Sequence, residues 1–167
     1  VFRNSLARHP ICRLRMMNIY LDYNASTPID PGVATVMRPL LEDLFGNPSS
    51  DHWASHPAAE ILFKARALGA KGRGASPGEI VFTSGGSEAN NLAIKGMALA
   101  APRGRHIITT PIEHEAVLES CDYLVRHHGF EVTMLGVDRE GLVDPGELES
   151  VIRADTTLVS VMYANNE

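Results

Sequence analysis

Residues 80–94 read IVFTSGGSEANNLAI. A short apolar run at 80–83 is followed by the glycine pair Gly85 and Gly86 and then by apolar residues at helical spacing. This order predicts a buried strand, a tight turn and the start of a helix. The first N–H groups of a helix have no partner within it, and the helix dipole adds positive potential there. The segment therefore suits an anion, above all a phosphate, with hydroxyl donors from Ser84 and Ser87.

The same residues also fit an ordinary strand-to-helix turn that binds nothing, and the segment alone does not separate the two interpretations. Two well-known nucleotide motifs are absent, because the chain contains neither G-x-G-x-x-G nor G-K followed by Ser or Thr. Other parts of the chain have to decide what the glycine turn does.

The rest of the chain alternates between strand and helix patterns. Strands are predicted near 80–83, 106–109, 131–135 and 158–162, and helices near 88–99, 115–127 and 145–153. Such alternation is typical of a parallel sheet with helices on both faces. The fold class predicted is α/β, a three-layer αβα arrangement with a mainly parallel sheet.

Helix start signals lie on both sides of this region. Asp30 is predicted to cap a helix whose first position is Pro31. Pro39 is expected to kink this helix. A second helix is expected at 57–68. Asp144 and Pro145 repeat the start signal, with Glu147 placed for a capping box. Three glycines within 69–74 weaken the expectation of local order there.

The composition is that of a globular protein, with 44% hydrophobic and 21% charged residues. The net charge of −5 argues against nucleic acid as a partner, and no apolar run is long enough to span a membrane. Two cysteines, Cys12 and Cys121, are too few for a disulfide framework and fit a reducing compartment. Cys121 falls on the apolar face of a predicted helix, so we interpret it as a core residue.

The first 17 residues contain four arginines and no acid. They form either a basic leader of the kind that targets an organelle or upstream read-through ahead of Met16 and Met17, and we favour the second interpretation. The expected location is the cytoplasm, with the mitochondrion as the alternative if the leader is real. The predicted domain organisation is 1–17 as a basic leader or upstream read-through and 18–167 as the segment that holds the predicted helices and strands.

Five motifs occur in a characteristic order. They are YLDYNASTP at 20–28, FGNPSS at 45–50, the glycine turn, EHEAV at 113–117 and MYANNE at 162–167. Together they closely resemble the N-terminal part of cysteine desulfurases of the NifS/IscS type, which are pyridoxal-phosphate enzymes of the class V aminotransferase family. The resemblance implies an incomplete large domain of a pyridoxal-phosphate enzyme of fold type I.

The resemblance also implies roles for individual residues. Gly86 and Ser87 would hold the phosphate of pyridoxal 5′-phosphate. His114 would stack on the pyridine ring and move protons, although a lone histidine before a helix is also a common cap. Asn166 would hydrogen-bond the phenolic oxygen, although an Asn pair also favours a turn. Residues 23–27 match a motif near the substrate, and no metal site is expected.

By resemblance, the complete enzyme would convert L-cysteine to L-alanine and carry the sulfur as an enzyme persulfide. A sulfur-acceptor protein, such as an iron–sulfur scaffold, and a second copy of the chain are the expected partners, without nucleic acid or membrane. Selenocysteine lyase and an inactive truncated remnant stay open as alternatives.

Two positions depart from the family pattern: relatives commonly have Gly-Arg at Ser55–His56 and Lys at Glu115. The family's cofactor lysine and persulfide cysteine follow beyond residue 167. We therefore expect the 167-residue chain to be inactive by itself and its coding sequence to be cut short.

Overall fold

The computed structural model describes residues 18–100 and 102–165. The predictions for the basic leader, 1–17, and for Asn166 lie outside these described residues. The chain divides into two units, Val1–Phe45 and Gly46–Glu167, and each is described by itself.

The first unit contains one described helix, α1 (Pro31–Glu42). The Asp30 carboxylate accepts hydrogen bonds from the backbone N–H groups of Gly32 (2.8 Å) and Val33 (3.3 Å), so the predicted cap is confirmed. Pro31 occupies the first turn, where its missing N–H costs nothing. Pro39 lies inside the helix, which ends shortly after it, and none of the helix residues is buried.

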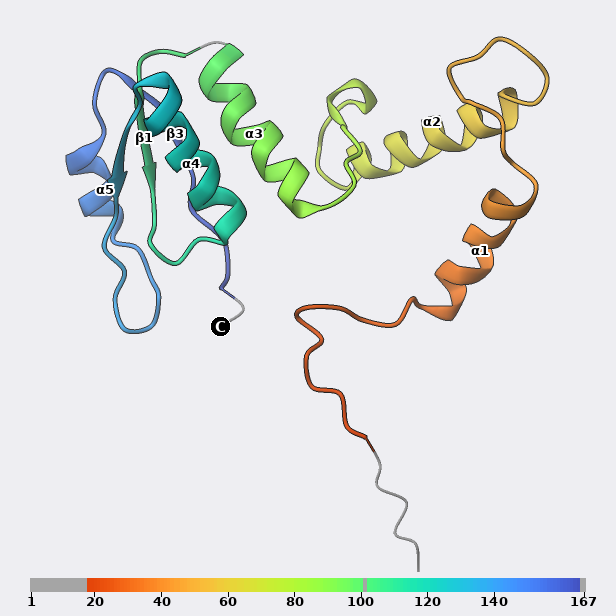
Figure 1. Cartoon of the computed structure of the whole chain (residues 1–167), viewed down its shortest axis with the longest axis horizontal. Helices are drawn as coiled ribbons and strands as arrows, with labels where there is room; N and C mark the ends of the chain where they lie inside the picture. Colours follow the sequence, from red (N-terminus) through yellow and green to blue (C-terminus); the bar gives the residue numbers. More distant parts are fainter. Residues whose placement is uncertain (1–17, 101, 166–167) are drawn as a thin grey trace, which may run out of the picture. The chain divides into compact units, whose positions relative to one another are not determined.

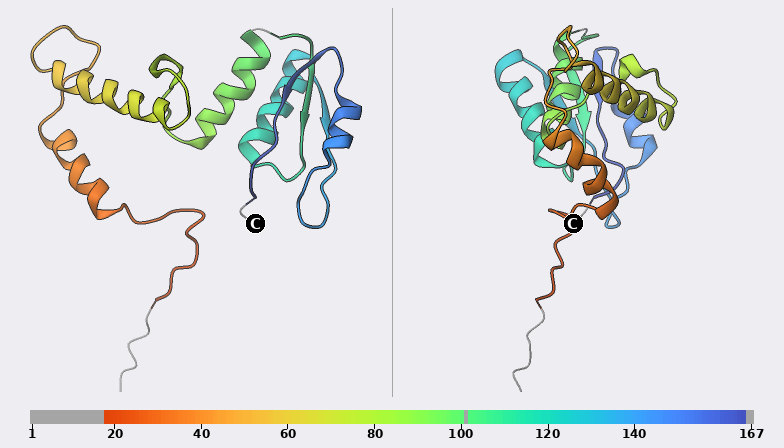
Figure 2. Two further views of the ribbon diagram at one scale, coloured as in Figure 1. Left: turned by 180° about the vertical axis from the view of Figure 1, so that it is seen from behind. Right: turned by 90° about the vertical axis from the view of Figure 1, so that its right-hand side faces the viewer.

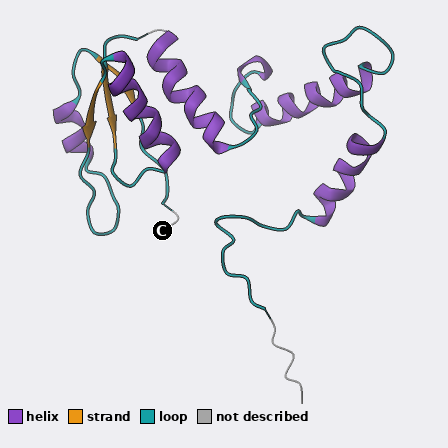
Figure 3. Cartoon of the chain, viewed as in Figure 1, coloured by secondary structure: helices purple, strands orange, loops and turns teal. Residues whose placement is uncertain are grey.

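The second unit is built around a parallel sheet of three strands (Figures 1 and 3). The central strand is β1 (His106–Thr109), with β2 (Glu131–Met134) on one side and β3 (Thr156–Val159) on the other. Both pairings are parallel, as the alternating pattern predicts. The predicted strands at 106–109 and 131–135 are confirmed. Strand β3, which was predicted at 158–162, begins two residues earlier, at Thr156.

The crossovers place helices on both faces of this sheet. Helix α4 (Glu115–His128) connects β1 to β2 in one direction, and α5 (Pro145–Val151) connects β2 back across β1 to β3. Because parallel crossovers are right-handed, connections in opposite directions leave their helices on opposite faces. Figure 2 shows α4 and α5 on the two sides of the sheet. The three-layer αβα prediction is confirmed.

The core lies between the sheet and the pair α3 (Gly86–Ala100) and α4, which pack against each other. It combines apolar residues from both helices with the central strand and the start of β2: Ile94, Ala98, Ile107, Val117, Cys121, Leu124 and Phe130. Cys121 is 1% exposed, which confirms it as a core residue. This packing fixes α3 and α4 relative to the sheet, and with them the two helix starts that carry the candidate site.

Helix α2 (His56–Lys71) is longer than predicted. It continues past Gly69 to Lys71 and is followed by Gly74 at φ 64°. A short 3₁₀ turn, η1 (Pro77–Glu79), then leads into the glycine-turn segment, and its capping box is formed by Ser76 and Glu79. The glycine-rich stretch is therefore a helix end and a turn, which glycine suits because it adopts positive φ without strain.

The predicted strand at 80–83 is wrong. These residues belong to no strand, and Val81 and Phe82 are 63% and 49% exposed. No segment among the described residues pairs with them, and a strand is stable only when its N–H and C=O groups find a neighbouring backbone. Arg66 of α2 instead donates to the carbonyl of Ile80 and lies over the Phe82 ring at 5.0 Å.

The capping box predicted for α5 is replaced by a longer-range bond. Asp144 caps the helix by accepting from Gly146 N at 2.8 Å, as predicted. The Glu147 carboxylate accepts instead from the backbone N–H of Gly136, at 3.1 Å. It thereby ties α5 to the loop that follows β2.

Candidate functional site

Three connections meet at the edge of the sheet where the strands end. β1 runs into residues 110–114, β2 into 135–144 and β3 into 160–165. In Figure 1 the N-terminal ends of α3 and α4 lie toward this same end of the sheet. Ligands of open α/β sheets bind at the carboxyl ends of the strands, so this edge is the candidate functional site.

The glycine turn opens α3 with unobstructed space around it. Gly86 is the first residue of the helix, and the carbonyl of Gly85 accepts from Ala89 N at 3.1 Å. A Cβ built on either glycine would meet no atom within 4 Å. The backbone N–H groups of Gly86 and Ser87 belong to the first turn, which cannot satisfy them within the helix. This donor set fits a phosphate group.

Ser84 is not the spare hydroxyl donor that the sequence suggested. Both its backbone N–H and its hydroxyl donate to one oxygen of Glu88, each at 2.7 Å. These bonds to the Ser84 hydroxyl and then to its N–H lower the pKa of Glu88. Glu88 therefore closes the turn from inside the helix, and Ser87 is the hydroxyl left beside the glycine pair.

His114 is the N-cap of α4. Its Nδ1 accepts from the backbone N–H of Ala116 at 3.0 Å, which in the neutral ring places the proton on Nε2. The side chain is exposed. The cap interpretation is thus what the structure shows. It leaves Nε2 and the ring face accessible, so the predicted cofactor role stays compatible with the geometry.

Sequence reasoning missed a buried carboxylate beside this histidine. Glu113 is 8% exposed, and its Oε1 accepts from the backbone N–H of Met162, just after β3. A second bond runs between the same two loops, because the side-chain Nδ2 of Asn165 donates to the carbonyl of Ile112 at 2.9 Å. The only available signal was an acid adjacent to the candidate histidine at a strand end.

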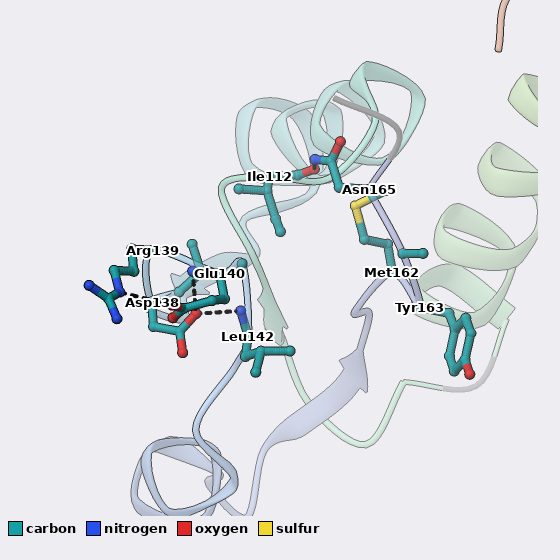
Figure 4. Close-up of a pocket in the computed structure, with 11 residues that line it drawn as sticks. Ile112, Asp138, Arg139, Glu140, Leu142, Met162, Tyr163 and Asn165 are labelled. Atoms are coloured by element: carbon teal, nitrogen blue, oxygen red, sulfur yellow. Dashed lines mark hydrogen bonds and ion pairs between the residues drawn. The ribbon is translucent and has the colours of Figure 1, made fainter.

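A hollow of about 520 Å³ adjoins Asn165 at the same edge (Figure 4). It lies between the loop after β2 and the segment after β3, with Ile112 and Leu142 among its lining residues. Asp138 shapes the loop by accepting from the backbone N–H groups of Glu140 (2.9 Å) and Leu142 (2.8 Å). Neither His114 nor Gly86 lines the hollow, so it is separate from the predicted phosphate site.

Two hydroxyls at the carboxyl end of β1 are buried without a partner. Thr109 and Thr110 are 0% exposed, and within the described part of the chain their Oγ1 atoms accept and donate no hydrogen bond. In the first unit, the motif at 20–28 is held locally by a 2.9 Å bond between Tyr20 and Ser26.

The described residues contain no group of three or more His, Cys, Asp or Glu side chains placed to bind a metal ion. Among the same residues, no helix is both long and apolar enough to cross a membrane.

Comparison with known proteins gives a consistent result. Residues 19–167 match the family model described as aminotransferase class V. The chain is 51% identical over 150 residues to "Cysteine desulfurase IscS" of Dictyoglomus turgidum and 47% identical over 150 residues to the protein of that name from Methanosarcina thermophila. These matches cover 89% of the chain but only 38% and 37% of the relatives, so the chain spans little more than a third of their length.

Solved structures agree. A "NIFS-LIKE PROTEIN" superposes with a TM-score of 0.85 at 45% identity, covering 90% of this chain and 42% of that one. A structure titled "SspA in complex with cysteine" superposes with a TM-score of 0.83 at 44% identity, covering 89% of this chain and 43% of that one.

Proposed function

Because this chain belongs to the class V aminotransferase family, whose members of the cysteine desulfurase type depend on pyridoxal phosphate, we propose that it is the N-terminal portion of a cysteine desulfurase. The observation that carries this proposal is the pairing of two helix starts at one sheet edge. One bears the open Gly85–Gly86 turn and the other bears His114. The 51% identity to a cysteine desulfurase supports the specific reaction.

The proposed cofactor site uses the first turn of α3. The N–H groups of Gly86 and Ser87, with the Ser87 hydroxyl, hold the phosphate, where the helix dipole favours negative charge. Asn166 holds the phenolic oxygen. When bound, pyridoxal phosphate supplies an electron sink for the substrate carbon. His114 covers the ring and holds or moves a proton at Nε2, because Nδ1 is engaged by the helix cap.

The proposed substrate is L-cysteine, with L-alanine and a protein-bound persulfide as products. Cysteine is preferred to selenocysteine because similar curated proteins are named cysteine desulfurases and a similar solved structure, titled "SspA in complex with cysteine", contains cysteine. We propose residues 18–167 as one portion of the catalytic domain. A homodimer, a sulfur-acceptor protein such as an iron–sulfur scaffold, and a cytoplasmic location complete the proposal.

The test measures alanine and sulfide released from L-cysteine by the full-length protein that carries this sequence, with pyridoxal phosphate bound. We expect equal amounts of the two products under reducing conditions. His114→Ala should lower the rate by about 10²- to 10⁴-fold, the usual contribution of a proton-transferring side chain. His127→Ala removes an exposed histidine at the other end of α4 and should leave the rate unchanged.

Three results would overturn the proposal. They are no alanine despite bound cofactor, turnover of selenocysteine but not of cysteine, and a His114→Ala variant as active as the parent. The first favours the inactive remnant and the second favours a selenocysteine lyase.

A further inference from the structure

The loops that follow β1 and β3 are joined by a reciprocal pair of hydrogen bonds. Glu113 reaches from the first loop to the backbone N–H of Met162 in the second. Asn165 reaches from the second loop to the backbone carbonyl of Ile112 in the first, at 2.9 Å. Each loop thus supplies one side chain to the backbone of the other, and we call these four residues the clasp.

The Glu113 half of the clasp is buried. The residue is only 8% exposed, and burying a carboxylate is costly unless donors or positive potential face it. Met162 N–H supplies a donor, and the N-terminus of α4 begins two residues later. Its charge also adds to burial in raising the pKa of Cys121, a core residue of α4. These constraints hold Glu113 in one orientation.

His114 follows Glu113 directly and is held at two points. The clasp fixes its backbone against the segment after β3, and the cap to Ala116 N fixes its ring. At the other end of the clasp, Asn165 precedes Asn166 in the chain. The clasp therefore spans the gap between the two loops that carry predicted cofactor contacts.

We propose that Glu113 and Asn165 are positioning residues that set where His114 lies relative to the segment after β3. The role of His114 toward a cofactor rests on the proposed function above. The placement of His114 by the clasp does not, so it can be tested on the protein without cofactor.

The first experiment compares Glu113→Ala with Glu113→Gln, which keeps an acceptor oxygen for Met162 N–H. Two readouts are followed by NMR in the cofactor-free protein: the hydrogen-exchange rate of the Met162 amide and the ring ¹⁵N shifts of His114. With Ala we expect Met162 to exchange about tenfold faster and the His114 ring to lose its single Nδ1-accepting form. Gln should restore both readouts. Glu119→Ala, which removes an exposed glutamate one turn after the start of α4, should change neither the Met162 exchange rate nor the His114 shifts.

A second variant protects the test against loss of folding. Asn165 is exposed, so Asn165→Ala should fold, and it removes the bond to Ile112 while leaving Glu113 in place. We expect it to shift the His114 ring signals in the same direction as Glu113→Ala, by a smaller amount.

Unchanged Met162 exchange and unchanged His114 shifts in folded Glu113→Ala would overturn the proposal, whatever the enzyme does. If Glu113→Ala does not fold, unchanged His114 shifts in Asn165→Ala would overturn the proposal instead. If the NMR changes occur but the full-length protein releases no alanine from cysteine, the clasp stands and the proposed function fails.

Discussion

At the scale of single residues, His106 is a buried histidine used as a structural link. It lies in the central strand at 0% exposure. Its Nδ1 is 2.8 Å from the Thr156 hydroxyl in β3, and its Nε2 is 2.8 Å from the Thr133 hydroxyl in β2. The Thr156 oxygen already accepts from Arg153 N, so its proton is free to point at Nδ1. The neutral ring therefore joins all three strands.

This link predicts a pH dependence of stability. Burial lowers the pKa of His106, with the Arg153 charge adding to the effect and Asp155 and Glu131 opposing it. The unfolded chain binds a proton near pH 6.5, whereas the folded chain binds it only at lower pH. The contribution of neutral His106 to the free energy of unfolding is thus complete above about pH 6.5. It is lost as the pH falls through the folded pKa, with a slope of up to about 1.4 kcal/mol per pH unit.

Urea unfolding between about pH 7.5 and pH 5 checks this prediction, since carboxylates with lowered pKa titrate below that window. His106→Gln, which has no titrating ring, should unfold with a flatter pH profile. His127→Gln, at an exposed position, should keep the parent slope. An equal slope in His106→Gln would contradict the assignment.

The thiol of Cys121 should be unreactive in the folded protein. Burial, and secondarily the charge of Glu113, raises its pKa to about 11, so the thiol stays protonated near neutral pH. The thiolate is the reactive form, and only 1% of the residue is exposed. In a Cys12→Ser variant, Ellman's reagent should modify Cys121 only slowly in buffer and rapidly in concentrated urea. Rapid modification in buffer would mean that the α3–α4 core opens readily.

At the scale of elements, the end of α4 depends on a glycine. Gly129 has φ 66° and donates its N–H to the carbonyl of Leu124, which closes the helix. A Cβ there would also come within 3.0 Å of the Arg105 guanidinium. Gly129→Ala should therefore lower the free energy of unfolding by about 1–2 kcal/mol, measured by urea denaturation. No change would show that the turn relaxes at no cost.

At Gly86, the first residue of α3, we expect a substitution by Ala to affect ligand binding rather than the free energy of unfolding. It has no positive φ and no atom within 4 Å of an added Cβ, so Gly86→Ala should leave stability nearly unchanged. If the backbone approaches a phosphate there, the added methyl group should weaken binding of pyridoxal phosphate by about tenfold or more. Fluorescence titration of the full-length protein measures this. Gly78→Ala, at an equally open glycine in η1, is the matched control.

At the scale of the whole molecule, apolar side chains remain exposed on helices of both units. In the first unit Val36 and Leu41 of α1 are 71% and 79% exposed. In the second, Phe63 and Leu68 of α2 are 65% and 72% exposed. Contiguous exposed apolar surface is typical of protein–protein interfaces, because water is displaced when it is covered.

We therefore expect the 167-residue chain to self-associate. Light scattering at increasing concentration should give a mass above that of the monomer. Val36→Glu combined with Leu41→Glu should reduce the association, whereas Asp43→Lys, a charge change beside the same helix, should not. A stable monomer at all concentrations would contradict this expectation.

Features that depend on near neighbours along the chain could be predicted from the residues alone. Asp30 with Pro31 and Asp144 with Pro145 mark helix starts, because a cap needs only N–H groups two or three residues away. The alternation of strands and helices specified a parallel αβα sheet, because short crossovers allow few other arrangements. The order of the five motifs was enough to indicate the family.

Features that need a partner far away in the chain could not be predicted and became visible only in the folded protein. Residues 80–83 have the composition of a strand, yet they stay unpaired because no described backbone lies beside them. Glu113, Asn165 and His106 look like ordinary polar residues in the sequence. Their roles come from partners 49, 53 and 50 positions away in the chain, which only the folded sheet brings within hydrogen-bonding distance.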